Sequence, residues 1–358
     1  MTLSISRVSR ILNRPGLSLV LVGFSVLAFV SVVLALSGVA PMETFRLLAQ
    51  GSLGSSVYLG HVLKTFIPLT LCSMGLVYTF RIGLWNIGIE GQIIAGALGG
   101  FAFFRLFDTW TWLAFPLALV GSFASGAFLA WLSGLLKTRF GVHEIFAGLG
   151  LNFVAQGLTL WLIFGPWKRP GIASMSGTDP IADVFFLSEK GPFALSPFAI
   201  ALVVVVFFLS WVLIRQTLIG LKLHASGTNP TASRLLGLRP SLSLLFALTV
   251  CGGLAGLAGF FQVTGVYHRL IPSISSGYGY LAILVVLLSR YDIRFVPLIS
   301  FFFSCLNVGS IQLPMVLQID SSLSGVIQGL VVLFFLLVKS MKDRSVQNQV
   351  SNREVSDE

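Results

Sequence analysis

About ten long apolar segments limit what this chain can fold into more than any other feature. A helix of roughly 20 apolar residues crosses the hydrocarbon core of a bilayer. Only 10% of the 358 residues are charged, whereas a soluble domain carries about 25%. We therefore expect an all-α polytopic membrane protein. The predicted spans are Leu17–Val39, Leu59–Phe80, Leu84–Phe107, Trp110–Leu136, Ile145–Gly165, Phe193–Ile214, Ser241–Gly265, Tyr278–Ser289, Phe295–Ser310 and Leu323–Val338. The eighth and ninth are short enough to be half-helices.

Basic residues predict the orientation of these spans. The net charge of +10 is spread between the apolar segments, so nucleic acid is not an expected partner. Membrane proteins concentrate Lys and Arg in their cytoplasmic loops. Most of the 23 basic residues become cytoplasmic if both termini lie inside. This predicts a permease domain over residues 1–340, an outer loop over 165–192, a cytoplasmic loop over 215–240 and a disordered cytoplasmic tail over 341–358.

The sequence lacks the motifs of the common catalytic sites. It contains no P-loop, no GxSxG nucleophile motif and no HExxH zinc motif. Its three Cys lie in apolar segments and its four His are scattered, so we expect no metal and no cofactor on this chain. Glycines at 253, 256 and 259 lie inside one predicted span, where their spacing favours close helix packing.

Polar residues inside the predicted spans are the candidates for function, because burying them in lipid is costly. Glu90 stands out, between Gly88 and Gly91 and close to Asn86 and Gln92. This composition favours an unwound stretch that opens a half-helix, with Glu90 near its positive end. The polar side chains either line a path for a solute or brace neighbouring helices. The same two readings apply to Asn152 and Gln156, which share one face of the fifth span.

The loop over residues 215–240 contains the signals of a short helix. Asn229 is a favourable N-cap and Pro230 suits the first helical position. Gly237 is able to end the helix in the left-handed conformation. A short capped helix outside the bilayer is suited to docking another protein, whereas a plain solvated loop is the alternative.

Four segments in this order resemble the permease subunits of bacterial ABC importers. The similarity is greatest to the nucleoside branch of the simple-sugar and branched-chain amino-acid permease superfamily. The segments are Asn86–Gln92, Gly141–Asn152, Gly220–Gly237 and Ser276–Ile283. Together they run through most of residues 81–290, and no single one is diagnostic.

The resemblance implies a fold, a set of partners and two groups of site residues. It implies inverted repeats, with broken half-helices beginning at Asn86–Gln92 and at Ser276–Tyr280 and the substrate route between them. It implies separate ATPase subunits that hold ATP and Mg, a second permease subunit, and an external binding protein that delivers substrate. The implied substrate-pathway residues are Asn86, Glu90, Gln92, Asn152, Gln156 and Tyr278. The implied ATPase-coupling residues are His224, Gly227, Asn229, Pro230, Arg234 and Gly237.

The expected function is thus a multi-pass importer subunit of the bacterial inner membrane, most consistent with nucleoside transport, and not an enzyme. A permease for a simple sugar such as ribose or galactose is the first alternative. An ion-coupled secondary transporter is the second, although such carriers need titratable groups in the membrane and Glu90 is the only acid well inside a span. A channel or membrane scaffold is the third. Neither a secondary transporter nor a channel or scaffold requires a capped cytoplasmic helix.

Overall fold

The computed structural model describes residues 28–29, 31–32, 35, 40–169, 177–188, 191–317, 326, 329–330 and 333. Most of these residues are helical, and in the described ranges the only β-pairing is an isolated bridge between Lys168 and Thr178. The chain divides into two compact units, one of Ser56–Ser304 and one of Met1–Ser55 with Cys305–Glu358. An all-α protein is therefore confirmed.

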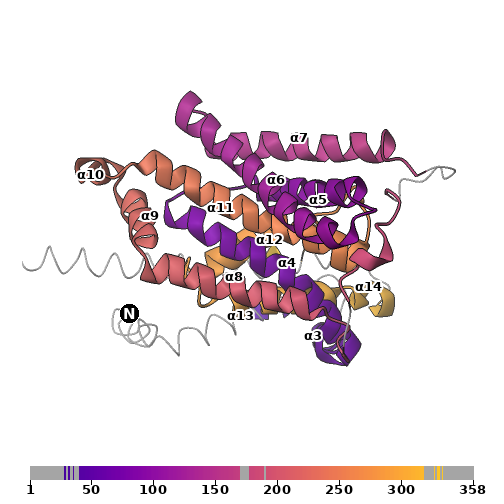
Figure 1. Cartoon of the computed structure of the whole chain (residues 1–358). Helices are drawn as coiled ribbons and strands as arrows, with labels where there is room; N and C mark the ends of the chain where they lie inside the picture. Colours follow the sequence, from indigo (N-terminus) through magenta and orange to yellow (C-terminus); the bar gives the residue numbers. More distant parts are fainter. Residues whose placement is uncertain are drawn as a thin grey trace, which may run out of the picture. The chain divides into compact units, whose positions relative to one another are not determined.

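The larger unit contains nearly all of the helices (Figure 1). Its elements are α4 (Ser56–Arg81), α5 (Ile89–Leu106), α6 (Thr111–Phe140), α7 (Glu144–Phe164), η1 (Asp183–Phe185), α8 (Pro197–Gln216), α9 (Leu218–Thr228), α10 (Pro230–Leu235), α11 (Pro240–Phe261), the π-helix η2 (Gln262–Tyr267) and α12 (Tyr278–Leu288). Helix α13 (Val296–Ser310) begins in this unit. The smaller unit contains α3 (Pro41–Leu53) and α14 (Gln312–Leu317).

Six helical segments are long and apolar enough to cross a membrane, namely α4, α5, α6, α7, α8 and α11 continued by η2. They match the second to seventh predicted spans. Helices α12 and α13, with 11 and 15 residues, match the eighth and ninth and are short, as predicted. The first and last predicted spans, and the 341–358 tail, lie almost wholly outside the described residues.

Three helices, α3, α9 and α14, occur where none was expected. Helix α3 buries Thr44, Leu48, Gly51 and Ser52, which repeat at helical spacing along one face. Helix α9 occupies much of the segment that was expected to be a loop. These helices were not predicted because a search for long apolar runs overlooks short helices.

Glycines allow α5, α6 and α11 to pack backbone against backbone. A Cβ atom on Gly96 of α5 would overlap Gly256 of α11, and one on Gly126 of α6 would overlap the carbonyl of Gly252. A Cβ on Gly259 would likewise overlap the carbonyl of Ile93. Small residues promote close helix contact in a membrane, where no hydrophobic force drives helices together. The predicted role of the glycine repeat in α11 is thereby confirmed.

The described part of the 165–192 loop is fastened to the end of the bundle where α5 ends and α6 begins. Ile181 N donates to His268 O at 2.8 Å, and Leu187 N donates to Thr264 O at 3.0 Å. Phe185 of η1 packs on Phe104 of α5, with ring centroids 4.7 Å apart. The described residues of this loop therefore pack on the bundle.

Candidate functional site

The two predicted half-helix starts meet at Glu90. Helix α5 begins at Ile89 after an irregular stretch, so Glu90 lies in its first turn. Its carboxylate accepts hydrogen bonds from Gly277 N at 3.1 Å and from Gly279 N at 2.8 Å. These amides open α12, where the first turn of a helix has no internal acceptor for its N–H groups. Glu90 thus caps the partner half-helix and faces the positive end of its dipole.

The segment between α11 and α12 returns into the protein without regular helix. Helix α11 ends in the π-helix η2, and His268 then turns the chain with a φ of +57°. Leu270 and Ile274 are fully buried, and Gly277 has a φ of +73° immediately before α12. Irregular backbone is tolerated at membrane depth only where protein or water satisfies it. Glu90 satisfies two of the N–H groups that this return leaves open.

Asn86 and Gln92 form a reciprocal amide pair. Asn86 Nδ2 donates to Gln92 Oε1 and Gln92 Nε2 donates to Asn86 Oδ1, both at 3.0 Å. Asn86 Nδ2 also lies 3.2 Å from Cys251 Sγ on α11. Both side chains are buried. The pair closes the irregular stretch onto the first turn of α5, which favours the bracing role for these two residues.

Asn152 connects α7 to the same stretch. Its Oδ1 accepts from Gly91 N at 2.8 Å, and its Nδ2 donates to Ile87 O at 3.0 Å. Gly88 and Gly148 lie so close that a Cβ on either would overlap the other's backbone. Asn152 is therefore held by protein groups on both sides, and in this arrangement it too braces the start of α5.

Gln156 and Tyr278 lie farther along, against the irregular return. Gln156 Nε2 donates to Pro272 O at 2.8 Å, and the Tyr278 hydroxyl lies 3.5 Å from Thr65 Oγ1 on α4. The six predicted pathway residues thus come from α5, α7, α12 and the stretch before α5. Asn86, Glu90, Gln92 and Asn152 lie around the start of α5, whereas Gln156 contacts the segment that leads into α12 and Tyr278 contacts α4.

Gln262 is a polar residue of this region that the sequence analysis passed over. It is fully buried in η2, and its Nε2 donates to Ile274 O at 3.2 Å and to Ser276 Oγ at 3.3 Å. Its Oε1 accepts no hydrogen bond from the described residues. Ser276 Oγ also lies 2.9 Å from the Tyr267 hydroxyl. A glutamine inside a predicted span was the signal, by the same reasoning that singled out Glu90.

The short helix of the 215–240 loop has the predicted capping residues. Asn229 Oδ1 accepts from Ala232 N at 2.9 Å, and Pro230 is the first residue of α10. Gly237 adopts a φ of +78°, and Leu238 N donates to Ser233 O at 3.0 Å. Helix α10 ends at Leu235, two residues before Gly237, and it projects beyond the ends of α8 and α11 (Figure 1).

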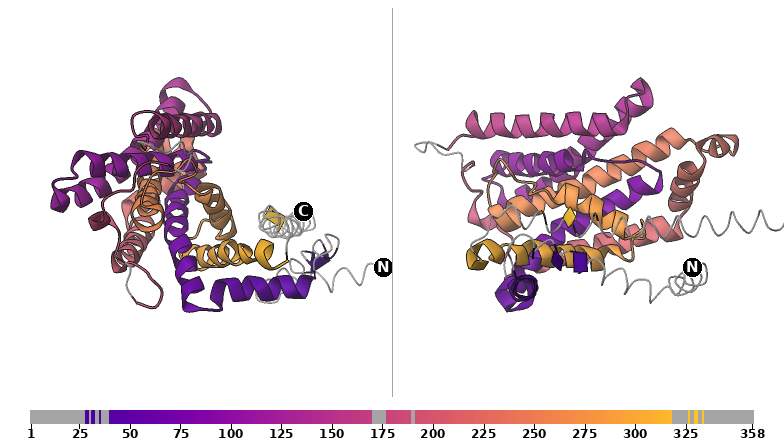
Figure 2. Two further views of the ribbon diagram at one scale, coloured as in Figure 1. Left: turned by 90° about the vertical axis from the view of Figure 1, so that its right-hand side faces the viewer. Right: turned by 180° about the vertical axis from the view of Figure 1, so that it is seen from behind.

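Helix α9 fastens α10 to the bundle. It runs from the end of α8 to the start of α10, packing on α8 and α11 (Figure 2). Gly227 packs so tightly that a Cβ would overlap the Arg81 carbonyl and Ile82 at the end of α4. Among the predicted coupling residues, Gly227 therefore contacts the bundle and Arg234 is exposed on α10, while His224 lines a cavity beside α9.

Comparisons with known proteins agree with this architecture. The glucose ABC transporter permease protein TsgB13 of Haloferax volcanii is 30% identical over 342 residues, which cover 90% of this chain and 87% of that protein. The guanosine ABC transporter permease protein NupP of Bacillus subtilis is 26% identical over 86% of this chain and 89% of its own. The nucleoside ABC transporter permease protein NupB of Lactococcus lactis is 25% identical over 78% of this chain and 79% of its own.

A family model also matches residues 58–336, which contain every element from the irregular start of α5 to the half-helix α12. Its description is "Branched-chain amino acid transport system / permease component". The match covers both half-helix starts, the α9–α10 loop and all six segments long enough to span a membrane. This chain is a multi-pass membrane protein and belongs to the branched-chain amino acid transport system / permease component family.

Proposed function

We propose that this chain is the membrane-spanning subunit of an ATP-driven importer for nucleosides in the bacterial inner membrane, with both termini in the cytoplasm. It works beside a second permease subunit, identical or paralogous. Separate ATPase subunits hold ATP and Mg, and an external protein delivers the substrate. The chain itself binds no cofactor. It supplies the path, which opens alternately to the two sides.

The observation that carries this proposal is the pair of half-helices joined through Glu90. Helix α5 leads away from the end of the bundle that contains Arg81, and α12 leads toward it. Discontinuous helices of opposite direction place polar backbone and helix ends at membrane depth, where transporters bind their solutes. The Glu90 hydrogen bonds link the two halves, so a movement of one half is transmitted to the other.

Two further features favour an uncharged polar substrate of nucleoside type. The amide and hydroxyl groups of Gln156, Gln262, Tyr267 and Ser276 lie near the return segment, and such groups hydrogen-bond to neutral solutes. NupP and NupB, which resemble this chain over most of its length, are guanosine and nucleoside permeases by name. A sugar substrate is the second candidate, because the relative TsgB13 is a glucose permease by name.

Uptake measurements with and without the gene test the substrate class. We expect cells lacking this chain to lose most high-affinity uptake of labelled guanosine or uridine and to regain it on complementation, with glucose uptake unchanged. Vesicles with collapsed ion gradients should still accumulate the nucleoside when ATP is present. Loss of glucose uptake alone would favour the sugar permease, and accumulation that needs an ion gradient but no ATP would contradict the ABC importer.

Helix α10 offers an apolar surface for an ATPase subunit. Leu235 and Leu236, at its end, are 86% and 79% exposed. Replacing both by Ala should reduce uptake about tenfold, because exposed apolar side chains at a docking site contribute strongly to binding. Membrane abundance should stay the same, since neither side chain is buried in the bundle. The measurements are uptake and substrate-stimulated ATP hydrolysis in the reconstituted importer.

A substitution at the N-cap of α10 provides the matched control. Asn229→Ala removes the acceptor for Ala232 N and costs the helix about 1 kcal/mol, whereas Asn229→Ser keeps an acceptor. The Asn229→Ser variant should therefore couple ATP hydrolysis to uptake normally, whereas Asn229→Ala should couple the two poorly. Unchanged ATP hydrolysis and uptake in the double leucine variant would remove α10 from the ATPase interface.

A further inference from the structure

The amide of Gln262 has an oxygen atom to which no described residue donates a hydrogen bond. Gln262 is the first residue of the π-helix η2, and its side chain is fully buried. Its Nε2 donates to Ile274 O at 3.2 Å and to Ser276 Oγ at 3.3 Å. Because a backbone carbonyl only accepts hydrogen bonds, the amide nitrogen and not the oxygen must face Ile274. The arrangement therefore leaves an acceptor, and not a donor, available to a ligand.

The backbone around Gln262 has irregularities that are common at binding sites. Turns of π-helix are rare and occur often at functional sites. His268 follows η2 with a φ of +57°, and Ser276 has a φ of +52°, values that residues other than glycine rarely adopt. Strained backbone of this kind gathers at ligand sites and persists where the surrounding structure imposes it. A buried acceptor without a donor is also costly, so the combination favours a functional role.

Hydrogen bonds connect Gln262 to less buried positions of the return segment (residues 268–277). Ser276 Oγ lies 3.3 Å from Gln262 Nε2 and 2.9 Å from the Tyr267 hydroxyl. Ser276 and Tyr267 are both partly exposed, and Ser273 is exposed. Irregular backbone at membrane depth is tolerated only where it is buried in protein or lines water. The exposed positions of the return segment therefore face water or a partner subunit, not lipid.

The return segment also covers the amide in this conformation. It forms no regular helix, so it is able to shift without breaking one. The outer loop holds it through two hydrogen bonds, from Thr178 N to Leu270 O at 3.0 Å and from Leu270 N to Thr178 Oγ1 at 3.1 Å. Because Gln262 is bonded to the segment at Ile274 and Ser276, a shift of the segment uncovers the amide.

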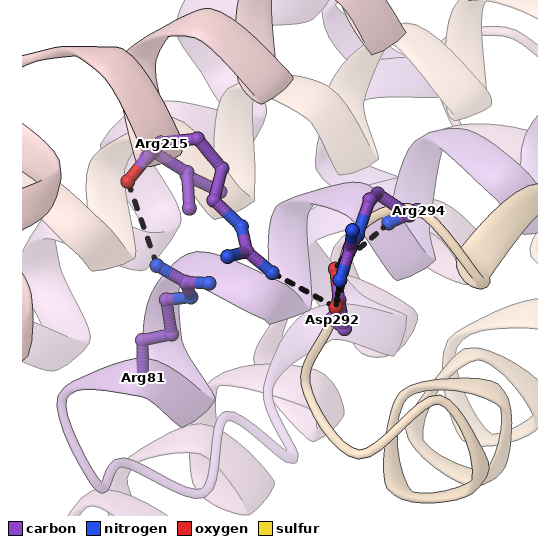
Figure 3. Close-up of polar contacts among 5 residues, drawn as sticks. Arg81, Arg215, Asp292 and Arg294 are labelled. Atoms are coloured by element: carbon purple, nitrogen blue, oxygen red, sulfur yellow. Dashed lines mark hydrogen bonds and ion pairs between the residues drawn. The ribbon is translucent and has the colours of Figure 1, made fainter.

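Charged groups beyond the far end of α12 are bonded to one another instead (Figure 3). Arg215 Nη2 and Arg294 Nη2 each donate to Asp292 Oδ2 at 2.8 Å, and Arg81 Nη1 lies 3.5 Å from Ile214 O. Hydrogen bonds from Arg294, and then from Arg215, hold the pKa of Asp292 well below its usual range, so the carboxylate stays ionised. The Arg215–Asp292 pair joins the end of α8 to the turn after α12. These charged groups therefore fasten helices together, unlike the amide oxygen described above.

We propose that Gln262 selects the transported solute by accepting a hydrogen bond from one of its hydroxyl groups. This role rests on the importer function proposed above. An amide oxygen accepts and never donates, so the solute must supply the donor. A hydroxyl suits the site, because it donates to Oε1 and also accepts from the hydroxyl of Ser276 or Tyr267. Nucleosides and sugars both carry such groups, whereas each deoxy analogue lacks one.

Uptake of uridine and of its 2′-, 3′- and 5′-deoxy analogues by the reconstituted importer tests this contact. The preference is the maximal uptake rate of uridine divided by that of each analogue. Gln262→Met keeps the length of the side chain without the amide oxygen. We expect its preference over one of the analogues to be about tenfold lower than that of the unchanged chain, the size of effect expected for one hydrogen bond. The same external protein and ATPase subunits are used throughout, so their own selectivity cancels when chains are compared.

Three further variants separate a solute contact from a bracing role. Gln262→Glu keeps an acceptor oxygen, so it should retain the preference. Thr264→Val changes a buried residue of the same π-helix whose hydroxyl already donates to Phe260 O at 2.9 Å, and it should show the preference of the unchanged chain. Tyr267→Phe removes a hydroxyl beside Ser276 and should lower the preference by a smaller factor. It serves if Gln262→Met does not reach the membrane.

An unchanged preference in Gln262→Met would overturn the contact. A fall in the uptake of all four solutes by one factor would assign Gln262 to bracing and would overturn it too, as would an equal loss of preference in Thr264→Val. The proposed substrate fails separately. If the unchanged chain takes up glucose and no nucleoside, the nucleoside assignment is refuted, and the same variants are then compared on glucose and its deoxy analogues.

Discussion

Glu90→Leu is expected to abolish uptake and to deplete the protein from the membrane. The substitution leaves the buried Gly279 N and the partly buried Gly277 N without their acceptor. Each unsatisfied buried donor costs about 1–3 kcal/mol, so the loss is about 2–6 kcal/mol before repacking. That is a large part of the stability of most proteins. Membrane abundance, thermal unfolding and uptake per molecule should be measured together.

Glu90→Gln provides the matched comparison. The amide keeps the size of the side chain and one acceptor oxygen, so it is able to satisfy one of the two N–H groups. We expect this variant to retain a substantial part of ATP-dependent uptake, at lower thermal stability. A proton- or sodium-coupled carrier would instead need the charge. Complete loss of accumulation in Glu90→Gln at normal abundance and stability would therefore count against an ATP-driven mechanism.

Gly256→Ala is expected to prevent proper packing of the bundle. The added Cβ would overlap the carbonyl of Ser122 on α6, and Gly256 already abuts Gly96 of α5. Backbone atoms have no rotamer by which to move aside, so α11 must shift away from α6. Overpacking of this kind costs up to about 3 kcal/mol. We expect little folded protein in the membrane and a lower midpoint of thermal unfolding for what remains.

The control for this change is Gly157→Ala on α7. Gly157 lies inside a helix too, but no heavy atom lies near the position of its added Cβ. Since Ala favours helix more than Gly by roughly 1 kcal/mol, this variant should be as stable as the original or slightly more so. If both variants lost stability equally, a general effect on membrane insertion would be responsible rather than the α6–α11 contact.

The sequence alone predicted most of the described helices because their signals are local. Apolar length identified the six spanning segments, and the Asn229, Pro230 and Gly237 positions set the limits of α10 to within one residue. The glycines around Glu90 indicated an interrupted helix, and α5 indeed starts at Ile89. Short helices such as α3 and α9 were missed, since neither contains a long apolar run.

The two readings of the mid-membrane polar residues could not be separated without the fold. Asn86, Gln92 and Asn152 have hydrogen-bond partners within the protein, which favours bracing. Gln262 has an amide oxygen with no hydrogen-bond partner among the described residues. The sequence analysis did not include it among the candidate site residues. Whether a polar side chain has all of its hydrogen-bond partners within the protein depends on which distant groups lie near it. The spacing of residues along one helix does not reveal this.

What the sequence determined by itself is the class of protein and the local starts and stops of its helices. The class follows from the need to bury apolar, internally hydrogen-bonded segments in lipid. The starts and stops of the helices follow from capping residues, which act within one turn. The tertiary structure alone decided that Glu90 accepts a hydrogen bond from Gly277, 187 residues later at the start of α12, and that Arg81, Arg215 and Arg290 line one cavity. Such contacts join segments whose separation along the chain carries no signal, because packing of whole helices brings them together.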